Sequence, residues 1–157
     1  MNTELQLFSV ARKRKPNYEY GEPHKVYENK LQRDFKADTI NQKWCTDFTY
    51  LFLTDGSKRY NCTIIDLHER IVIASITDKH MTADLAKRTL QKAINSQPGL
   101  NTCRLILHSD QGSQYTSKEF TEYYESVGIT QSMSNAGCPC DNAPMERYYN
   151  TLENELI

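Results

Sequence analysis

The run of residues 43–53, KWCTDFTYLFL, constrains the fold of this chain more than any other segment. Large side chains recur at alternate positions, among them Trp44, Phe48 and Phe52, which is the two-residue period of a β-strand. The run ends in Thr-Asp-Gly-Ser at 54–57, a strong signal for a hairpin turn. The sequence therefore predicts that the chain begins its folded part with a long strand that turns back on itself.

Two more strand-like runs follow this turn, after which helical and strand-like patterns alternate. The predicted elements after the first strand are strands over 60–65 and 70–76, a helix over 82–95, a strand over 104–107, a helix opened by a Thr116-x-x-Glu119 capping box, a strand over 129–133, and a last helix capped by Asp141 or Asn142. The order β-β-β-α-β-α-β-α combines an antiparallel start with βαβ alternation. It predicts an α/β domain with a five-stranded mixed sheet flanked by helices.

Composition agrees with an ordinary soluble domain. The 157 residues are 38% hydrophobic and 25% charged, which suits one globular unit. No apolar run approaches the roughly 18 residues of a membrane span, and the N-terminus lacks the apolar core of a secretory signal. We therefore expect no membrane partner.

The cysteines point to a reducing compartment. They are an odd number, five, and the C-x-C pair Cys138 and Cys140 has no second ligand pair at the spacing of a zinc site. Cysteines in strand-like runs behave as small hydrophobic residues. Reduced thiols and the bacterial cytoplasm fit best.

Residues 1–40 are predicted to be a linker or tether, and residues 41–157 the folded core. The first segment is polar, contains Pro16 and Pro23, and has no sustained period. Its basic run, residues 12–15, is either a solvated linker or an arm that grips phosphate. The net charge of −1 does not identify a nucleic-acid partner, but local charge matters more than the sum.

Three carboxylates are the candidate functional groups. Asp47 lies within the first strand, Asp110 follows the fourth, and Glu146 lies near the start of the last helix, with 35 residues between Asp110 and Glu146. Each alone has an ordinary explanation, as a solvent-facing strand residue, a turn cap or an exposed helix residue. Together, at the ends of elements, they suit a hard divalent metal such as Mg²⁺.

The motifs around these residues are specific. W-x-x-D-x-T-Y surrounds Asp47, H-S-D-x-G-S-Q-Y surrounds Asp110, and S-M-S-x-x-G-x-x-x-D-N-A-x-x-E ends at Glu146. This set resembles the catalytic core of DDE-type insertion-sequence transposases, the branch closest to retroviral integrases, over roughly residues 30–157. The resemblance implies a ribonuclease-H-like fold and metal-dependent cleavage and transfer of DNA strands. It assigns Asp47, Asp110 and Glu146 as catalytic residues and as ligands of two Mg²⁺ or Mn²⁺ ions.

Further roles follow from the same resemblance. Double-stranded DNA, as element ends and target, and other copies of the chain are the implied partners. Gln114, Asn142 and Arg147 are predicted to contact DNA; alternatively, Gln114 caps the next helix and Asn142 orients the loop before Glu146. His108 is predicted to support the strand end before Asp110, and Gly112 to allow a tight backbone in the loop after it. Other acidic residues are weaker metal ligands because they lie in turns or in a helix cap: Asp55, Asp66 and Asp141.

The sequence departs from the family at Glu153. Relatives usually carry a lysine or arginine two helical turns after the glutamate, where it faces the same side of the helix at about 10 Å. A carboxylate there repels DNA, unless Arg147 or Lys118 supplies the positive charge. Relatives also extend further on both sides, so we expect a core truncated at both ends. The alternative is therefore a catalytically weak remnant that acts only in DNA binding or oligomerisation.

Overall fold

The computed structural model describes residues 25–155, and its elements follow the predicted order. Residues 1–24, including the basic run, and residues 156–157 lie outside the described part. The strands are β1 (Lys43–Phe52), β2 (Lys58–Asp66), β3 (Val72–Asp78), β4 (Ile106–Ser109) and β5 (Thr130–Met133). The helices are α1 (Ala83–Asn95), α2 (Lys118–Ser126) and α3 (Ala143–Glu155), with short 3₁₀ turns η1 (Thr102–Arg104) and η2 (Pro139–Asn142).

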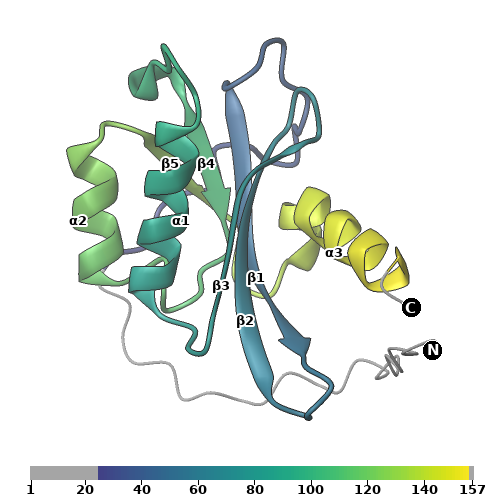
Figure 1. Cartoon of the computed structure of the whole chain (residues 1–157). Helices are drawn as coiled ribbons and strands as arrows, with labels where there is room; N and C mark the ends of the chain where they lie inside the picture. The colour runs from purple at the N-terminus through teal and green to yellow at the C-terminus, as the bar shows by residue number, and fades with distance from the viewer. Residues whose placement is uncertain (1–24, 156–157) are drawn as a thin grey trace.

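One five-stranded sheet, in the order β3-β2-β1-β4-β5, forms the centre of the molecule (Figure 1). The first three strands pair antiparallel, and β4 and β5 add to β1 in parallel. The predicted mixed sheet is therefore confirmed. β1 lies in the middle, between the antiparallel half and the parallel half.

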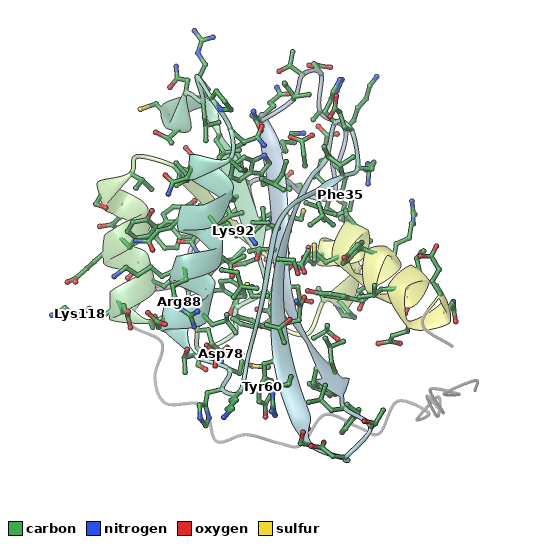
Figure 2. All side chains as sticks on the ribbon, in the orientation of Figure 1. Phe35, Tyr60, Asp78, Arg88, Lys92 and Lys118 are labelled. Atoms are coloured by element: carbon green, nitrogen blue, oxygen red, sulfur yellow. The ribbon has the colours of Figure 1, made fainter. Side chains whose placement is uncertain are left out.

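Helices cover both faces of the sheet. α1 and α2 lie on one face and α3 on the other (Figure 1). Arg88 of α1 forms an ion pair with Asp78 at the end of β3, and Lys92 donates to the carbonyl of Ser75 at 3.2 Å (Figure 2). These contacts fix α1 against the antiparallel half of the sheet.

Each face has its own apolar core. The core under α1 and α2 is the larger, and includes Trp44, Leu90 and Phe120. The core under α3 includes Cys45 and Met145. Because Trp44 and Cys45 are consecutive in β1, they point to opposite faces, as the two-residue period predicts.

Residues 25–40, assigned in the sequence to the tether, contribute to the α3-side core. Leu31 and Ala37 are buried, and Phe35 packs against them (Figure 2). This segment also runs beside β5, where the amide of Met133 donates to the carbonyl of Glu28 at 3.2 Å. The boundary between tether and core stays a prediction, since residues 1–24 lie outside the described part.

Two predicted helix caps differ from the structure. Ser117, not Thr116, caps α2, because its side chain accepts from the amide of Phe120, while the Thr116 hydroxyl donates to the carbonyl of Gly112. Asp141 does not cap α3. Its carboxylate is used in long-range contacts, described below, and the 3₁₀ turn η2 leads into the helix instead.

Asp66, predicted as a turn residue, is a buried anchor with 1% of its surface exposed. One carboxylate oxygen accepts from the amide of Asn41 at 2.7 Å and the indole of Trp44 at 3.2 Å. The other accepts from the amides of His68 and Glu69 at 2.8 and 3.1 Å. A buried carboxylate is tolerated because these four donors replace water.

Within residues 25–155, none of the helices has the length and apolar character needed to span a bilayer.

Replacing Asp66 with alanine should lower the free energy of unfolding by about 2–4 kcal/mol, since buried donors would lose their acceptor. Asp55→Ala is the matched control, because Asp55 also accepts a turn amide, from Ser57, but is exposed; its loss should be below about 1 kcal/mol. Urea unfolding followed by circular dichroism measures both. Equal losses for the two variants would contradict the anchoring role of Asp66.

Candidate active site

The parallel register of β1 and β4 brings Asp47 and Asp110 to corresponding positions. The paired residues are Lys43 with Ile106, Trp44 with Leu107, and Cys45 with His108. The pairing ends there; Asp47 follows two residues later within β1, and Asp110 directly follows Ser109, the last residue of β4. Since adjacent strands lie about 4.8 Å apart, the two carboxylates start from neighbouring backbone positions.

Both carboxylates belong to the face of the sheet that α3 covers. Cys45 packs in the core under α3, and Asp47, two residues later, shares its side of the strand. Ile106 also packs against this core, so His108 and Asp110 follow on the same side of β4. All three predicted carboxylates are partly exposed rather than buried.

Hydrogen bonds to β1 hold α3 on either side of Glu146. Before it, the side-chain amide of Asn142 donates to the backbone carbonyl of Thr46 at 3.3 Å. After it, the hydroxyl of Tyr149 donates to the backbone carbonyl of Asp47 at 2.6 Å. Positions four before and three after a residue share its helical face. Glu146 therefore lies on the side of α3 that faces β1, at the level of Asp47.

The loop after Asp110 is shaped by Gly112. The amide of Gly112 donates to the Asp110 carboxylate at 2.8 Å. A Cβ atom at position 112 would lie 2.8 Å from that carboxylate oxygen and 3.2 Å from the side-chain oxygen of Gln114. This close approach explains why the position needs glycine. It also places the Gln114 side chain next to the Asp110 carboxylate.

His108 is buried with both ring nitrogens engaged. Nδ1 lies 2.8 Å from the hydroxyl of Ser132, and Nε2 lies 3.1 Å from that of Ser134. Ser132 Oγ already accepts from the amides of Lys30 and Leu31, so its one hydrogen points to Nδ1. Burial also lowers the pKa of His108. The ring is therefore neutral, donates from Nε2, and has no nitrogen left for a metal.

Burial and the nearby aspartates raise the pKa values of two buried tyrosines, Tyr115 and Tyr149. Burial raises the pKa of Tyr115 well above its ordinary value, and the charges of Cys62, Asp47 and Asp110 raise it further. Burial likewise raises the pKa of Tyr149, and the charge of Asp47 adds to this effect. Tyr149 consequently keeps the proton that it donates to the backbone of Asp47.

The predicted residues differ in exposure. Asp47 in β1, Asp110 just after β4 and Glu146 in α3 are partly exposed, Arg147 and Glu153 of α3 are exposed, and Asn142 at the end of η2 is buried. Within residues 25–155, no three His, Cys, Asp or Glu side chains gather into a ready metal-binding group. The structure thus brings the three carboxylates to one region without assembling them into a single ligand set.

The chemistry of the donors in this region nevertheless fits a hard cation. The carboxylates offer oxygen atoms, His108 is already bonded through both nitrogens, and Cys45 is buried with a raised pKa. An all-oxygen set without thiolate or imidazole is the kind that Mg²⁺ and Mn²⁺ prefer.

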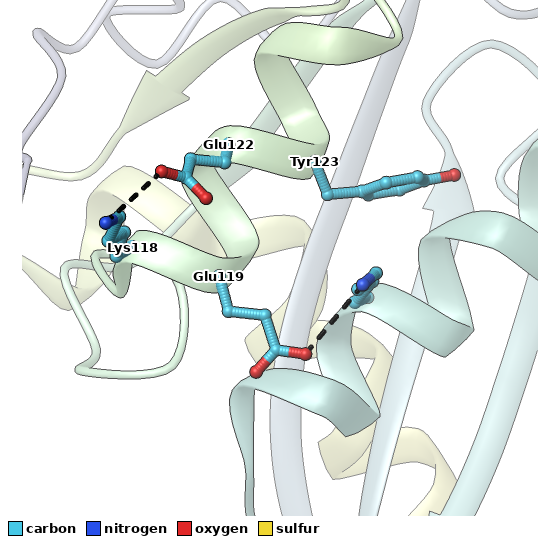
Figure 3. A pocket seen from close by; sticks show the side chains of 5 residues that line it. Lys118, Glu119, Glu122 and Tyr123 are labelled. Atoms are coloured by element: carbon cyan, nitrogen blue, oxygen red, sulfur yellow. Dashed lines mark ion pairs between the residues drawn. The ribbon is translucent and has the colours of Figure 1, made fainter.

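A surface pocket between α1 and α2 lies on the opposite face of the sheet. Lys87 pairs with Glu119 at 3.9 Å, and Lys118 pairs with Glu122 at 3.7 Å (Figure 3). Tyr123 completes the lining. The two positive and two negative charges cancel, so this pocket offers no net charge to a phosphate. Lys118, on α2, also lies on the opposite face of the sheet from Glu153 on α3, so it does not supply the positive charge expected near position 153.

Sequence reasoning missed two contributors to the site. Tyr149 reads as part of the apolar stripe of the last helix, although its hydroxyl bonds to the backbone of the strand that carries Asp47. Arg33 lies in the segment assigned to the tether, yet it bonds to Asp141 at 2.7 Å. Neither pairing leaves a local sequence signal, because the partners are about a hundred residues apart along the chain.

Comparison with known sequences agrees with the resemblance. The profile of the integrase core domain family matches residues 37–139. Transposase InsF for insertion sequence IS3fB of Escherichia coli (strain K12) is 39% identical over 132 residues, 84% of this chain and 45% of that protein. A probable transposase for insertion sequence element IS1353 of Shigella flexneri is 33% identical over 158 residues, 100% of this chain and 30% of that protein. The chain therefore spans less than half the length of these curated relatives.

Solved structures share the fold. The simian T-cell lymphotropic virus intasome, in complex with PP2A regulatory subunit B56 gamma, aligns with a TM-score of 0.65 at 18% identity, over 85% of this chain and 45% of that one. The HTLV-2 integrase catalytic core domain in complex with magnesium aligns with a TM-score of 0.58 at 22% identity, over 73% of this chain and 68% of that one. The catalytic domain of Mos1 mariner transposase aligns with a TM-score of 0.63 at 14% identity, over 74% of this chain and 60% of that one. The predicted ribonuclease-H-like fold is confirmed.

Gly112→Ala should displace the Asp110 carboxylate while changing the free energy of unfolding by less than about 1 kcal/mol, because the crowded atom ends a side chain that can rotate. The side-chain carboxyl ¹³C shift of Asp110 reports the displacement. Gly99→Ala is the control. Its φ of +73° predicts a loss of about 1–2 kcal/mol in the free energy of unfolding, and no atom lies within 4 Å of the added Cβ, so the Asp110 signal should not change. An unchanged Asp110 signal in Gly112→Ala would contradict the close approach.

Proposed function

Because the chain belongs to the integrase core domain family, we propose that it is the catalytic core of a bacterial insertion-sequence transposase. Its reaction is the metal-dependent cleavage and joining of DNA strands. The observation that supports the proposal is that Asp47 lies on β1, that β4, which leads directly to Asp110, pairs in parallel with β1, and that hydrogen bonds hold α3, which carries Glu146, against β1. The names of the relatives, which are transposases and integrases, support the same reaction class.

Asp47, Asp110 and Glu146 are the residues that would hold Mg²⁺ or Mn²⁺, two ions in the full site. When bound, such ions lower the pKa of an attacking water and stabilise the oxygen that leaves phosphorus. The HTLV-2 integrase core in the comparison was solved with magnesium. Glu146 has to approach the aspartates for all three carboxylates to act together. Like charges oppose that approach, and a divalent cation bound among the carboxylates would favour it.

The proposed cleavage is a displacement at phosphorus. A water oxygen bonds to phosphorus, the bond from phosphorus to the 3′-oxygen breaks, and the products are a 3′-hydroxyl and a 5′-phosphate. In the joining step, the 3′-hydroxyl oxygen bonds to a phosphorus of a second strand and loses its proton. The bond from that phosphorus to its own 3′-oxygen breaks, and the leaving 3′-oxygen is protonated to a new 3′-hydroxyl. The protein supplies no nucleophile: His108 is neutral and stays bonded to Ser132 and Ser134, while Gly112 and Tyr149 hold the Asp110 loop and α3 in place.

The proposal extends to partners and location. The DNA would be double-stranded, as element ends and target, and Gln114 and Arg147 are the residues proposed to contact it. Assembly with other copies of the chain is proposed because an HTLV-2 integrase core was solved in dimeric and trimeric forms. A bacterial cytoplasmic location remains the expectation from the reduced cysteines.

Asp47→Asn, Asp110→Asn and Glu146→Gln should each lower Mn²⁺-dependent nicking of supercoiled plasmid by at least about 100-fold, since each removes a charged oxygen ligand. Asp55→Asn, an exposed turn carboxylate, is the control and should nick normally. Circular dichroism checks that the folds survive. Normal cleavage by Asp47→Asn would refute the assignment, and DNA binding by a wild-type chain that never nicks would favour the inactive-remnant alternative.

Glu153→Lys should strengthen DNA binding and steepen its salt dependence by about one phosphate contact, because an exposed repulsive charge becomes attractive. The affinity is measured for a random duplex at several salt concentrations. Glu155→Lys makes the same charge change about 200° around the helix and serves as the control. If both variants show the same slope as wild type, position 153 does not face DNA.

A further inference from the structure

The loop that leads to Glu146 is held by an ion pair between the buried carboxylate of Asp141 and the exposed side chain of Arg33, more than a hundred residues earlier in the chain. Asp141, with 2% of its surface exposed, accepts from Arg33 Nε at 2.7 Å and from the side-chain amide of Asn29 at 3.1 Å. It also accepts from the backbone and side-chain amides of Asn135, at 3.0 and 3.1 Å. One carboxylate thus closes the loop on itself and joins it to the segment Asn29–Arg33.

The backbone of that segment is strained in a way that presents Arg33 to the loop. Gln32 and Arg33 have φ values of 47° and 65°, a left-handed conformation that costs a residue with a side chain about 1 kcal/mol or more. The Asn29 side chain accepts from the backbone amide of Gln32 at 2.8 Å. Leu31, which lies between these two residues in the sequence, is buried. Two consecutive non-glycine residues keep this conformation only where surrounding contacts compensate it.

The same segment reaches the strand that carries Asp110. The amides of Lys30 and Leu31 donate to Ser132 Oγ at 2.8 and 3.3 Å, and Ser132 bonds to His108. His108 lies two residues before Asp110. Asn29–Arg33 therefore connects the strand end at Asp110 with the loop before Glu146.

We propose that Asn29–Arg33 is a positioning clamp, with Arg33 as its principal residue, which holds residues 134–142 so that Glu146 can join the two aspartates. The proposal rests on the function proposed above and adds a residue to it. Arg33 precedes residue 37, at which the match to the family profile begins. The clamp acts through Asp141 and does not touch substrate.

Substitution of Arg33 should loosen the loop without unfolding the domain. Arg33 is 59% exposed, and Asp141 keeps its bonds to Asn29 and Asn135 when Arg33 is shortened. The effect should therefore be local. A displacement of a catalytic carboxylate by about 1 Å lowers the rate roughly 10- to 100-fold. The loss of one exposed charge, by contrast, changes the free energy of unfolding only slightly.

The test compares Arg33→Gln, Arg33→Lys and the control Arg104→Gln, an exposed arginine at the opposite end of β4. Amide hydrogen exchange over residues 134–142 should accelerate about tenfold in Arg33→Gln and remain at the wild-type rate in α1. Single-turnover nicking of supercoiled plasmid with MnCl₂ should slow about tenfold or more. Plasmid affinity and its salt slope should stay at wild-type values, and Arg33→Lys, which can still pair with Asp141, should recover most of the rate.

Several results would overturn the clamp. Unchanged exchange, or faster exchange with an unchanged rate, removes the positioning role. A weaker affinity and a salt slope reduced by about one contact, at an unchanged saturating rate, would make Arg33 a phosphate contact instead. The proposed function fails separately, if Asp47→Asn nicks like wild type or wild type does not nick, and hydrogen exchange then still decides whether Arg33 holds the loop.

Discussion

The parallel register between β1 and β4 is the constraint on which the site depends. Three residue pairs end at Cys45 with His108, and the two aspartates each follow two residues later, so this register underlies the inference that both carboxylates share one face. A slip of one residue would turn one carboxylate to the opposite face, since side chains alternate along a strand. Both strands are held in register by their buried neighbours, Trp44 and Leu107 on one face and Cys45 and His108 on the other. The apolar cores thus determine the geometry of a polar site.

The position of β1 explains why the site lies where it does. The chain builds the antiparallel half of the sheet on one side of β1, then crosses through α1 and adds β4 and β5 on the other. In α/β sheets, ligands bind beyond the carboxyl ends of strands where the strand order reverses. Asp110 directly follows β4 at such a point. Hydrogen bonds from η2 and α3 to the backbone of β1 hold the helix that carries Glu146 against this central strand.

The sequence predicted the order of the elements because each has a strong local pattern, but it misplaced the fourth strand by two residues. Residues 104–107 carry the apolar signal, whereas β4 is Ile106–Ser109, and Thr102–Arg104 forms a 3₁₀ turn. His108 and Ser109 read as polar loop residues, yet both are fully buried. His108 is tolerated there because Ser132 and Ser134 satisfy its ring. Such long-range partners have no counterpart in local sequence.

The same limit applies to the candidate site. The motifs identified the three carboxylates and Gly112. Glycine suits position 112 because a Cβ atom there would lie too close to the Asp110 carboxylate. Asp141 reads as a helix cap, since aspartate before a helix usually is one. Its true partners, Asn29 and Arg33, lie over a hundred residues earlier, in a stretch that looks like linker. A polar segment with few apolar residues can still pack when one leucine is buried and its amides find acceptors.

Anomalous diffraction from crystals soaked in MnCl₂ tests most directly whether Asp47, Asp110 and Glu146 bind one divalent metal centre. Manganese peaks are expected about 2.1 Å from carboxylate oxygens of Asp47 and Asp110, with Glu146 drawn towards them. Manganese bound instead at Asp66 or Asp141, or no peak near β1 and β4 at saturating MnCl₂, would contradict this assignment.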